Sequence, residues 1–129
     1  MGLTFDTGAL IGLERSRHYM RKVYDVAVSH DVRITVPSVV VTEWWRAGEK
    51  EEERVRILRS VAVESISDLV ARLAGVALTL APRAQTIDAI VMASASQRSD
   101  EIVYTSDPKD LQMLRDCVPQ FSSIRIERV

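Results

Sequence analysis

The chain has 129 residues, of which 47% are hydrophobic and 27% charged, and its formal net charge is −1 at pH 7. These values are ordinary for a globular protein and exclude a disordered, fibrous or collagen-like chain. The near-neutral charge gives no overall attraction to nucleic acid or to an anionic membrane, so any nucleic-acid contact has to come from a local patch.

The cysteine content and the apolar runs indicate where the protein acts. Cys117 is the only cysteine, so no disulfide framework is possible and a reducing compartment fits. The N-terminus has neither the basic region nor the long apolar region of a secretory signal, and no apolar run approaches the roughly 20 residues that span a bilayer. We therefore expect a soluble cytoplasmic protein without a membrane segment.

Short β-type runs alternate with helical patterns along the whole chain. The β-branched run before Pro37 is typical of a strand, and Ser38 is expected to cap the helix that follows and ends before Gly48. In chain order we predict a strand at 2–6, helices around 9–13 and at 16–29, a strand at 32–36, helices at 38–47 and from the acidic run 49–53 onward, a strand at 61–66, helices at 68–80 and 86–97, a strand at 102–105, a helix at 107–117 and a strand at 124–127.

This alternation predicts the fold class. Strands that alternate with helices favour an α/β protein whose mostly parallel sheet is covered on both faces. The chain contains no internal repeat, low-complexity tract or flexible linker. We expect residues 1–129 to form a single three-layer α/β/α domain.

Four acidic residues lie at unusual places in this pattern. Asp6 ends the first predicted strand and Asp107 ends the fourth, and ligands of open α/β sheets bind outside the carboxyl ends of the strands. Glu43 lies on a helix that is apolar nearly all round, and Asp88 lies in the first turn of another apolar helix. If the first and fourth strands are neighbours, their two carboxylates meet.

Each acid also has an ordinary structural interpretation. Asp6 and Asp107 could cap the helices that follow them. Asp88 could complement a helix dipole, and Glu43 could pair with Arg46. Taken one at a time, these interpretations are as good as a functional one.

Taken together, the four acids predict a metal site. Two unit charges about 4 Å apart repel by roughly 4 kcal/mol even at an effective dielectric near 20, so such a cluster needs protons or cations. Oxygen ligands without nearby His or Cys favour Mg²⁺ or Mn²⁺. The commonest use of this arrangement is phosphodiester hydrolysis, in which the ion activates a water molecule.

Four segments of the sequence resemble the acidic motifs of the PIN-domain family, in the family's order. They are FDTGALIGL, PSVVVTEWW, TIDAIVMASA and VYTSDPKDL. The compact length is most similar to the VapC-type toxins of bacterial toxin–antitoxin modules. The resemblance implies a PIN-like fold and a Mg²⁺- or Mn²⁺-dependent endoribonuclease that cuts structured RNA such as tRNA or rRNA. It also implies a homodimer and a cognate VapB-type antitoxin that blocks the acidic pocket.

The resemblance assigns roles to individual residues. It places the four acids in the catalytic and metal-binding positions: Asp6, Glu43, Asp88 and Asp107. It also implies support of the acidic site by a hydroxyl before the last acid, which is Thr105 or Ser106, and by Thr7 after the first. Asp110 is either an outer carboxylate of the site or an ordinary acid of a helix's first turn, and Gly8 stands where the family often has Ser.

A basic stretch and a pair of tryptophans each allow both a functional and a purely structural interpretation. The basic stretch of Arg15, Arg17, Arg21 and Lys22 is either an RNA-phosphate patch or a solvated helix face. Trp44 and Trp45 follow Glu43 directly; either both rings pack in the core, or one covers the surface and suits a dimer or antitoxin contact.

Other functions fit the sequence less well than a ribonuclease toxin. The same site would serve a PIN-type nuclease in RNA maturation without an antitoxin, and a short antitoxin gene directly upstream would favour the toxin. A receiver-like signalling module needs an acid pair after the first strand, an acceptor Asp after the third and a Lys after the last. The chain lacks all three. An acid-lined protein without activity is the third alternative, which four intact acids argue against.

Overall fold

A computed structural model of the protein describes residues 1–129 and contains one sheet of five strands, all of them parallel. The strands are β1 (Gly2–Phe5), β2 (Ile34–Pro37), β3 (Ala62–Glu64), β4 (Glu101–Thr105) and β5 (Arg125–Arg128). Their order in the sheet is β3-β2-β1-β4-β5. The chain therefore adds strands on one side of β1 first and then crosses to the other side to form β4 and β5.

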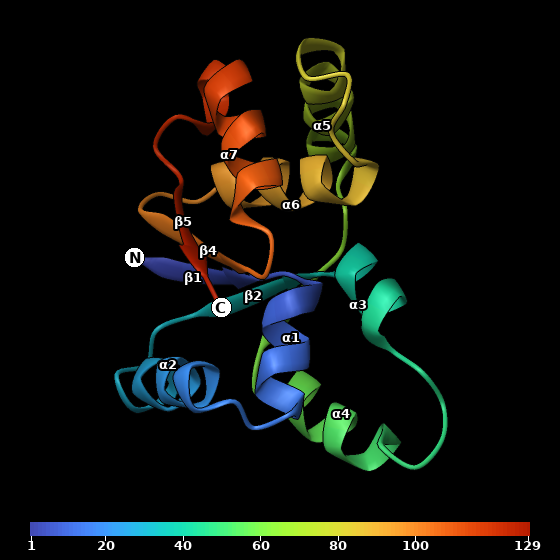
Figure 1. Cartoon of the computed structure of the whole chain (residues 1–129), viewed down its shortest axis with the longest axis vertical. Coiled ribbons are helices and arrows are strands. Elements are labelled where there is room, and N and C mark those ends of the chain that lie inside the picture. The colour runs from blue at the N-terminus through green and yellow to red at the C-terminus, as the bar shows by residue number, and fades with distance from the viewer.

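Helices cover both faces of this sheet. They are α1 (Thr7–Glu14), α2 (His18–Ser29), α3 (Ser38–Trp44), α4 (Glu51–Arg59), α5 (Asp68–Leu80), α6 (Thr86–Ser96) and α7 (Pro108–Cys117). Figure 1 shows α5, α6 and α7 on one side of the sheet and α1, α2 and α4 on the other, with α3 at its edge. The predicted three-layer α/β/α arrangement is confirmed, and the sheet is wholly rather than mostly parallel.

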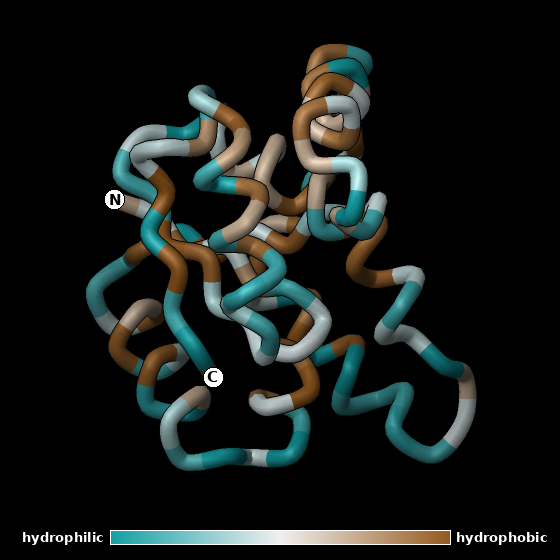
Figure 2. Tube along the Cα trace, turned by 45° about the horizontal axis from the view of Figure 1, so that its top comes forward, coloured by the Kyte–Doolittle hydropathy of each residue, from teal (hydrophilic) through white to brown (hydrophobic).

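The hydrophobic core lies on both faces of the central strands. All residues of β1, β2 and β4 are buried, whereas the edge strand β3 is partly buried and the edge strand β5 is largely exposed. The buried apolar residues form one continuous cluster. Figure 2 shows hydrophobic residues along the central strands and a hydrophilic connection between α3 and α4. Helices on both faces explain why the central strands read as apolar runs rather than as alternating patterns.

Three predicted features of secondary structure are wrong. The third strand covers Ala62–Glu64 instead of 61–66, because it is an edge strand that pairs with only three residues of β2. The helix after β2 ends at Trp44 instead of residue 47, since Trp45 adopts an extended conformation. Ser38 is the first helical residue instead of the cap, and Pro37 at the cap position has no side-chain hydrogen bond. The remaining boundaries agree within one or two residues.

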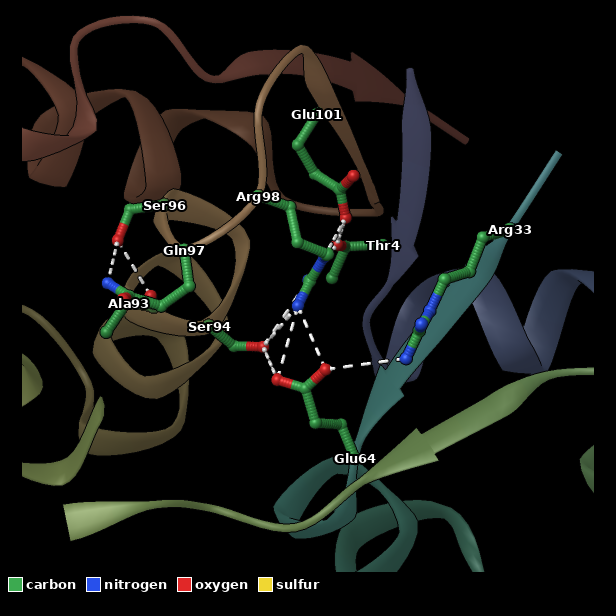
Figure 3. A network of polar contacts seen from close by, with 9 residues as sticks. All are labelled: Thr4, Arg33, Glu64, Ala93, Ser94, Ser96, Gln97, Arg98 and Glu101. Carbon is green, nitrogen blue, oxygen red and sulfur yellow. Dashed lines mark hydrogen bonds and ion pairs between the residues drawn. The ribbon is translucent and has the colours of Figure 1, made fainter. Parts of the chain in front are cut away.

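A partly buried polar network around Arg98, which follows the end of α6, joins β1, β3 and β4 (Figure 3). The Arg98 guanidinium donates from Nε to Glu101 Oε2 at 2.8 Å, from Nη1 to Glu64 at 3.2 Å and from Nη2 to Thr4 Oγ1 at 2.9 Å. The Thr4 hydroxyl also donates to Glu101, whose side chain is only 1% exposed. Gly2 makes room for this carboxylate, because a Cβ at Gly2 would lie 2.3 Å from Glu101 Oε1.

Candidate active site

The four predicted acids line one cavity of about 510 Å³ at the carboxyl ends of the strands. β1 and β4 are neighbours, and the strand order reverses between them, which is where ligands of open α/β sheets bind. The polar lining residues are Asp6, Thr7, Glu43, Gln85, Thr86, Asp88, Thr105, Ser106, Asp107 and Asp110. No Lys, Arg or His lines the cavity, so the protein supplies no cation against these carboxylates.

Asp6 caps α1 and also faces the cavity. Its Oδ1 accepts a hydrogen bond of 3.1 Å from the Ala9 amide, so the capping interpretation is correct. Burial raises the pKa of Asp6 from 3.8 to about 6. Hydrogen bonds from the Thr105 hydroxyl and from backbone amides oppose this rise, and the negative charge of Glu43 adds to it. The two interpretations of Asp6 are thus compatible, because one carboxylate oxygen holds the helix while the group remains part of the acidic cluster.

Asp88 experiences the charges of the whole cluster. It lies in the first turn of α6, and its pKa is raised from 3.8 to about 6, chiefly by burial. The negative charges of Asp110, Asp6, Glu43 and Asp107 raise it further. Repulsion from acids on three other segments of the chain, at the starts of α1 and α7 and on α3, indicates that these side chains share one electrostatic environment.

Thr105 is the hydroxyl residue that makes hydrogen bonds within the acidic site. Its buried Oγ1 accepts a hydrogen bond of 3.0 Å from the Asp107 amide, and its hydroxyl lowers the pKa of Asp6. The hydroxyl of Ser106 makes no hydrogen bond within the protein. Asp107 stands at the cap position of α7, yet its side chain makes no capping bond. The neighbouring Asp107 carboxyl group instead raises the pKa of Asp110.

Glu43 reaches the cavity from α3 and is held by Thr7. The Thr7 hydroxyl donates to Glu43 Oε1 at 2.6 Å. Arg46, the alternative partner, donates instead to the backbone carbonyl oxygens of Thr42 and Trp45. The predicted alternative of a Glu43–Arg46 pair is therefore absent from the structure.

Gly8 permits close contact between α1 and the loop after β4. A Cβ at Gly8 would lie 2.3 Å from Ser106 Oγ and 2.9 Å from the Ser106 backbone nitrogen. The Ser that is frequent at this position in the family would therefore require the loop to move. The absence of a side chain at this position therefore allows the start of α1 and the loop after β4 to lie side by side at the cavity.

The donor set of the cavity fits a hard divalent ion in chemistry and charge. Its ligands would be carboxylate and hydroxyl oxygens, which Mg²⁺ and Mn²⁺ prefer. As the side chains lie, no three His, Cys, Asp or Glu residues converge closely enough to ligate one ion together. Mg²⁺ usually retains several waters and takes only one or two carboxylates, so a three-ligand cluster is not required.

The other residues singled out in the sequence lie away from the cavity. Arg15, Arg17, Arg21 and Lys22 are exposed, and none of them lines it. Trp44 is buried, whereas Trp45 is half-buried and packs edge-on against it, with ring centroids 6.5 Å apart.

The sequence interpretation missed Gln85 and Thr86, which line the cavity at the start of α6. Their signal was weak, because two polar residues before an apolar helix are also typical of an ordinary helix start. It also missed Glu14, whose hydrogen-bond partners Trp44 and Arg54 are distant in the sequence.

Comparison with solved structures identifies the fold. No protein-family model matches the sequence, and no curated protein sequence matches it either. The chain is similar to a chain of VapBC2 from Rickettsia felis bound to a DNA fragment from their promoter, with a TM-score of 0.76, 13% identity, and coverage of 100% of this chain and 99% of that one. A chain of DNA-bound VapBC from Salmonella typhimurium gives a TM-score of 0.70 and 17% sequence identity, with coverage of 99% of this chain and 98% of that one. A chain of a toxin–antitoxin complex from Klebsiella pneumoniae gives a TM-score of 0.62 and 23% sequence identity, with coverage of 85% of this chain and 89% of that one.

These similarities cover essentially the whole chain in two of the three cases. The protein therefore has the PIN-like α/β/α fold that the motif resemblance predicted. None of its helices has the length and apolar character needed to cross a bilayer.

Proposed function

We propose that the protein is a Mg²⁺- or Mn²⁺-dependent endoribonuclease that acts as the toxin of a VapBC-type toxin–antitoxin module. One observation carries the proposal: the four acids predicted from separate motifs line one cavity that contains no basic residue. The similarity in fold to chains of VapBC complexes supports it.

In this proposal the ion would be held by one or two of the four carboxylates Asp6, Glu43, Asp88 and Asp107, and the others would face the reacting groups. A bound divalent ion would lower the pKa of a water nucleophile and offset negative charge on the phosphodiester. Thr105 fixes the backbone at Asp107, which orients that carboxylate toward the cavity.

The substrate and partners follow from the resemblance and from the charge of the cavity. A strongly anionic cavity repels the RNA backbone unless a cation is present, so ion binding and RNA binding are coupled. The resemblance suggests tRNA or rRNA as the RNA, a homodimer as the active form, and cytoplasmic action. A VapB-type antitoxin would block the cavity, and a basic side chain of the antitoxin would offset the charge that the protein leaves unbalanced.

Chelation tests the metal requirement. We expect the purified protein to cleave bulk tRNA or ribosomal RNA with Mg²⁺ or Mn²⁺, to lose this activity in EDTA, and to regain it when excess Mn²⁺ is added. The reason is that the cavity has no group of its own to offset the charge of a phosphodiester. RNA fragments separated on a gel and mapped by end sequencing give the measurement. Cleavage that is indifferent to EDTA would exclude the proposed chemistry.

Expression without an antitoxin tests the toxin role. We expect induced protein to stop bacterial growth, whereas the Asp88→Asn variant, expressed to the same soluble level, should leave growth unaffected. Growth curves and a quantitative immunoblot give the measurement. If the wild type cleaves RNA in vitro while growth continues normally, the alternative of a PIN-type nuclease in RNA processing is favoured over a toxin.

A further inference from the structure

Helix α1 contacts the last turn of α3 at both of its own ends. Thr7, the first residue of α1, donates to Glu43 Oε1 at 2.6 Å. Glu14, the last residue of α1, accepts from the indole Nε1 of Trp44 at 2.7 Å. Two consecutive residues of α3 are therefore held by the two ends of one helix.

The Glu14 carboxylate is a buried and well-fixed acceptor. Its side chain is 6% exposed, and Arg54 of α4 donates to it from Nε at 3.0 Å and from Nη2 at 3.1 Å. Lys50 lies 3.7 Å from Oε1. The Arg54 guanidinium also lies over the Trp44 ring, 5.6 Å from its centroid, and donates to the Arg46 carbonyl oxygen. These contacts tie α1, α3 and α4 together around one carboxylate.

The last turn of α3 is held by the buried Trp44 ring and by the hydrogen bonds that join Glu43 and Trp44 to the two ends of α1. The helix has only seven residues. Its N-terminal end has no side-chain capping bond, and at its C-terminal end the exposed Arg46 side chain donates to the Thr42 carbonyl oxygen. Residues 46–50, which follow it, are all exposed. So short a helix depends on tertiary contacts rather than on its own hydrogen bonds. Because Glu43 and Trp44 are adjacent on the helix, rotation of this last turn would move both side chains together.

The geometry points to Glu14 as a positioning residue for Glu43, acting through the hydrogen bond from Trp44 Nε1. This inference rests on the proposed function, since it concerns an acid of that same cavity. Glu14 itself does not line the cavity and touches none of its acids. Its contribution is to stop α3 from turning, so that Glu43 stays beside Thr7 and within the cavity.

The test removes the indole N–H group of Trp44, which donates to Glu14, and retains an aromatic ring at that position. Trp44→Phe keeps an aromatic side chain over Arg54 and leaves the Glu14–Arg54 pair intact. The matched control is Trp45→Phe, because the neighbouring indole N–H makes no hydrogen bond within the protein. We expect Trp44→Phe to weaken Mn²⁺ binding measured by calorimetry. At saturating Mn²⁺ it should lower kcat about tenfold, at the low end for groups that orient metal ligands, with the RNA KM unchanged. Trp45→Phe should leave both kcat and the Mn²⁺ affinity unchanged.

Two further comparisons separate positioning from stability. Glu14→Gln retains an oxygen that can accept from Trp44, so it should keep more activity than Glu14→Ala at a temperature where both are folded by circular dichroism. In the Glu43→Gln background, Trp44→Phe should cause no further loss of Mn²⁺ affinity, because it acts through the group already removed.

The outcomes distinguish this inference from the proposed function. A wild type that neither binds Mn²⁺ nor cleaves RNA overturns both. An active wild type whose Trp44→Phe variant melts earlier but keeps its kcat and Mn²⁺ affinity overturns only the role of Glu14. Equal losses in Trp44→Phe and Trp45→Phe would also overturn it.

Discussion

Replacing Asp6 by Asn is expected to lower RNA cleavage by more than about 100-fold, because even the outer partners of metal ligands contribute about 10- to 100-fold. The carboxylate lies among the other acids of the cavity, and Asn removes its charge with almost no change in shape. Initial rates on the RNA cleaved by the wild type, at saturating Mn²⁺, give the measurement.

The same substitution should stabilise the metal-free protein at neutral pH. The folded state holds Asp6 at a pKa of about 6 instead of 3.8, so ionisation favours the unfolded state. Below pH 3.8 the group is protonated in both states and the effect vanishes; it grows between pH 3.8 and 6 and is complete above that. The free energy of unfolding of Asp6→Asn should therefore equal that of the wild type near pH 3.5 and exceed it by up to about 3 kcal/mol at pH 7. Urea unfolding in the presence of EDTA gives the measurement.

The design separates catalysis from capping. Asn is as good a helix cap as Asp, so the hydrogen bond from the Ala9 amide should survive in the variant. Asp25→Asn, on the exposed face of α2, is the control that should alter neither activity nor stability. A large fall in melting temperature with activity retained would mean that Asp6 serves only as a cap.

Replacing Arg98 by Met should destabilise the protein by about 3–5 kcal/mol, the usual effect of removing one partner of a buried ion pair. The substitution leaves the Glu101 carboxylate, only 1% exposed, without its cation and leaves Glu64 with the largely exposed Arg33 alone. Such a loss is a large part of the total stability of about 5–15 kcal/mol that is typical of a domain. Urea unfolding followed by tryptophan fluorescence gives the measurement.

A second ion pair provides the matched control for Arg98. Arg125 and Asp100 lie 3.1 Å apart, but their side chains are 55% and 60% exposed, so Arg125→Met should change stability by less than about 1 kcal/mol. Adding Glu101→Gln to Arg98→Met should recover part of the loss, since the uncompensated charge disappears. Equal effects of Arg98→Met and Arg125→Met would contradict the role assigned to the network in Figure 3.

Local patterns predicted the fold and the acids of the cavity well, for a physical reason. A parallel sheet covered on both faces requires apolar strands, so Asp6 and Asp107 are conspicuous where two such strands end. That these two strands are neighbours could be stated only as a condition, because strand order depends on contacts between distant segments. Which of Thr105 and Ser106 makes the hydrogen bonds was likewise left open, since side-chain direction after the strand decides it.

The polar networks could not be predicted from the sequence. Thr4 and Glu101 are 97 positions apart, and Glu14 and Arg54 are 40 apart. Each of these residues has an unremarkable local context, and charged side chains are usually solvated. Only the packing of α6 on the sheet, and of α4 beside α1, gives them partners.

The strand order also decides when the cavity can form during synthesis. β4 lies beside β1 near the middle of the sheet, although it is almost the last strand to be translated. Until residue 107 has left the ribosome, Asp6 has no neighbouring strand on that side and the acidic cluster lacks one wall. A chain that ends before residue 107 lacks Asp107 and therefore cannot form the complete cavity.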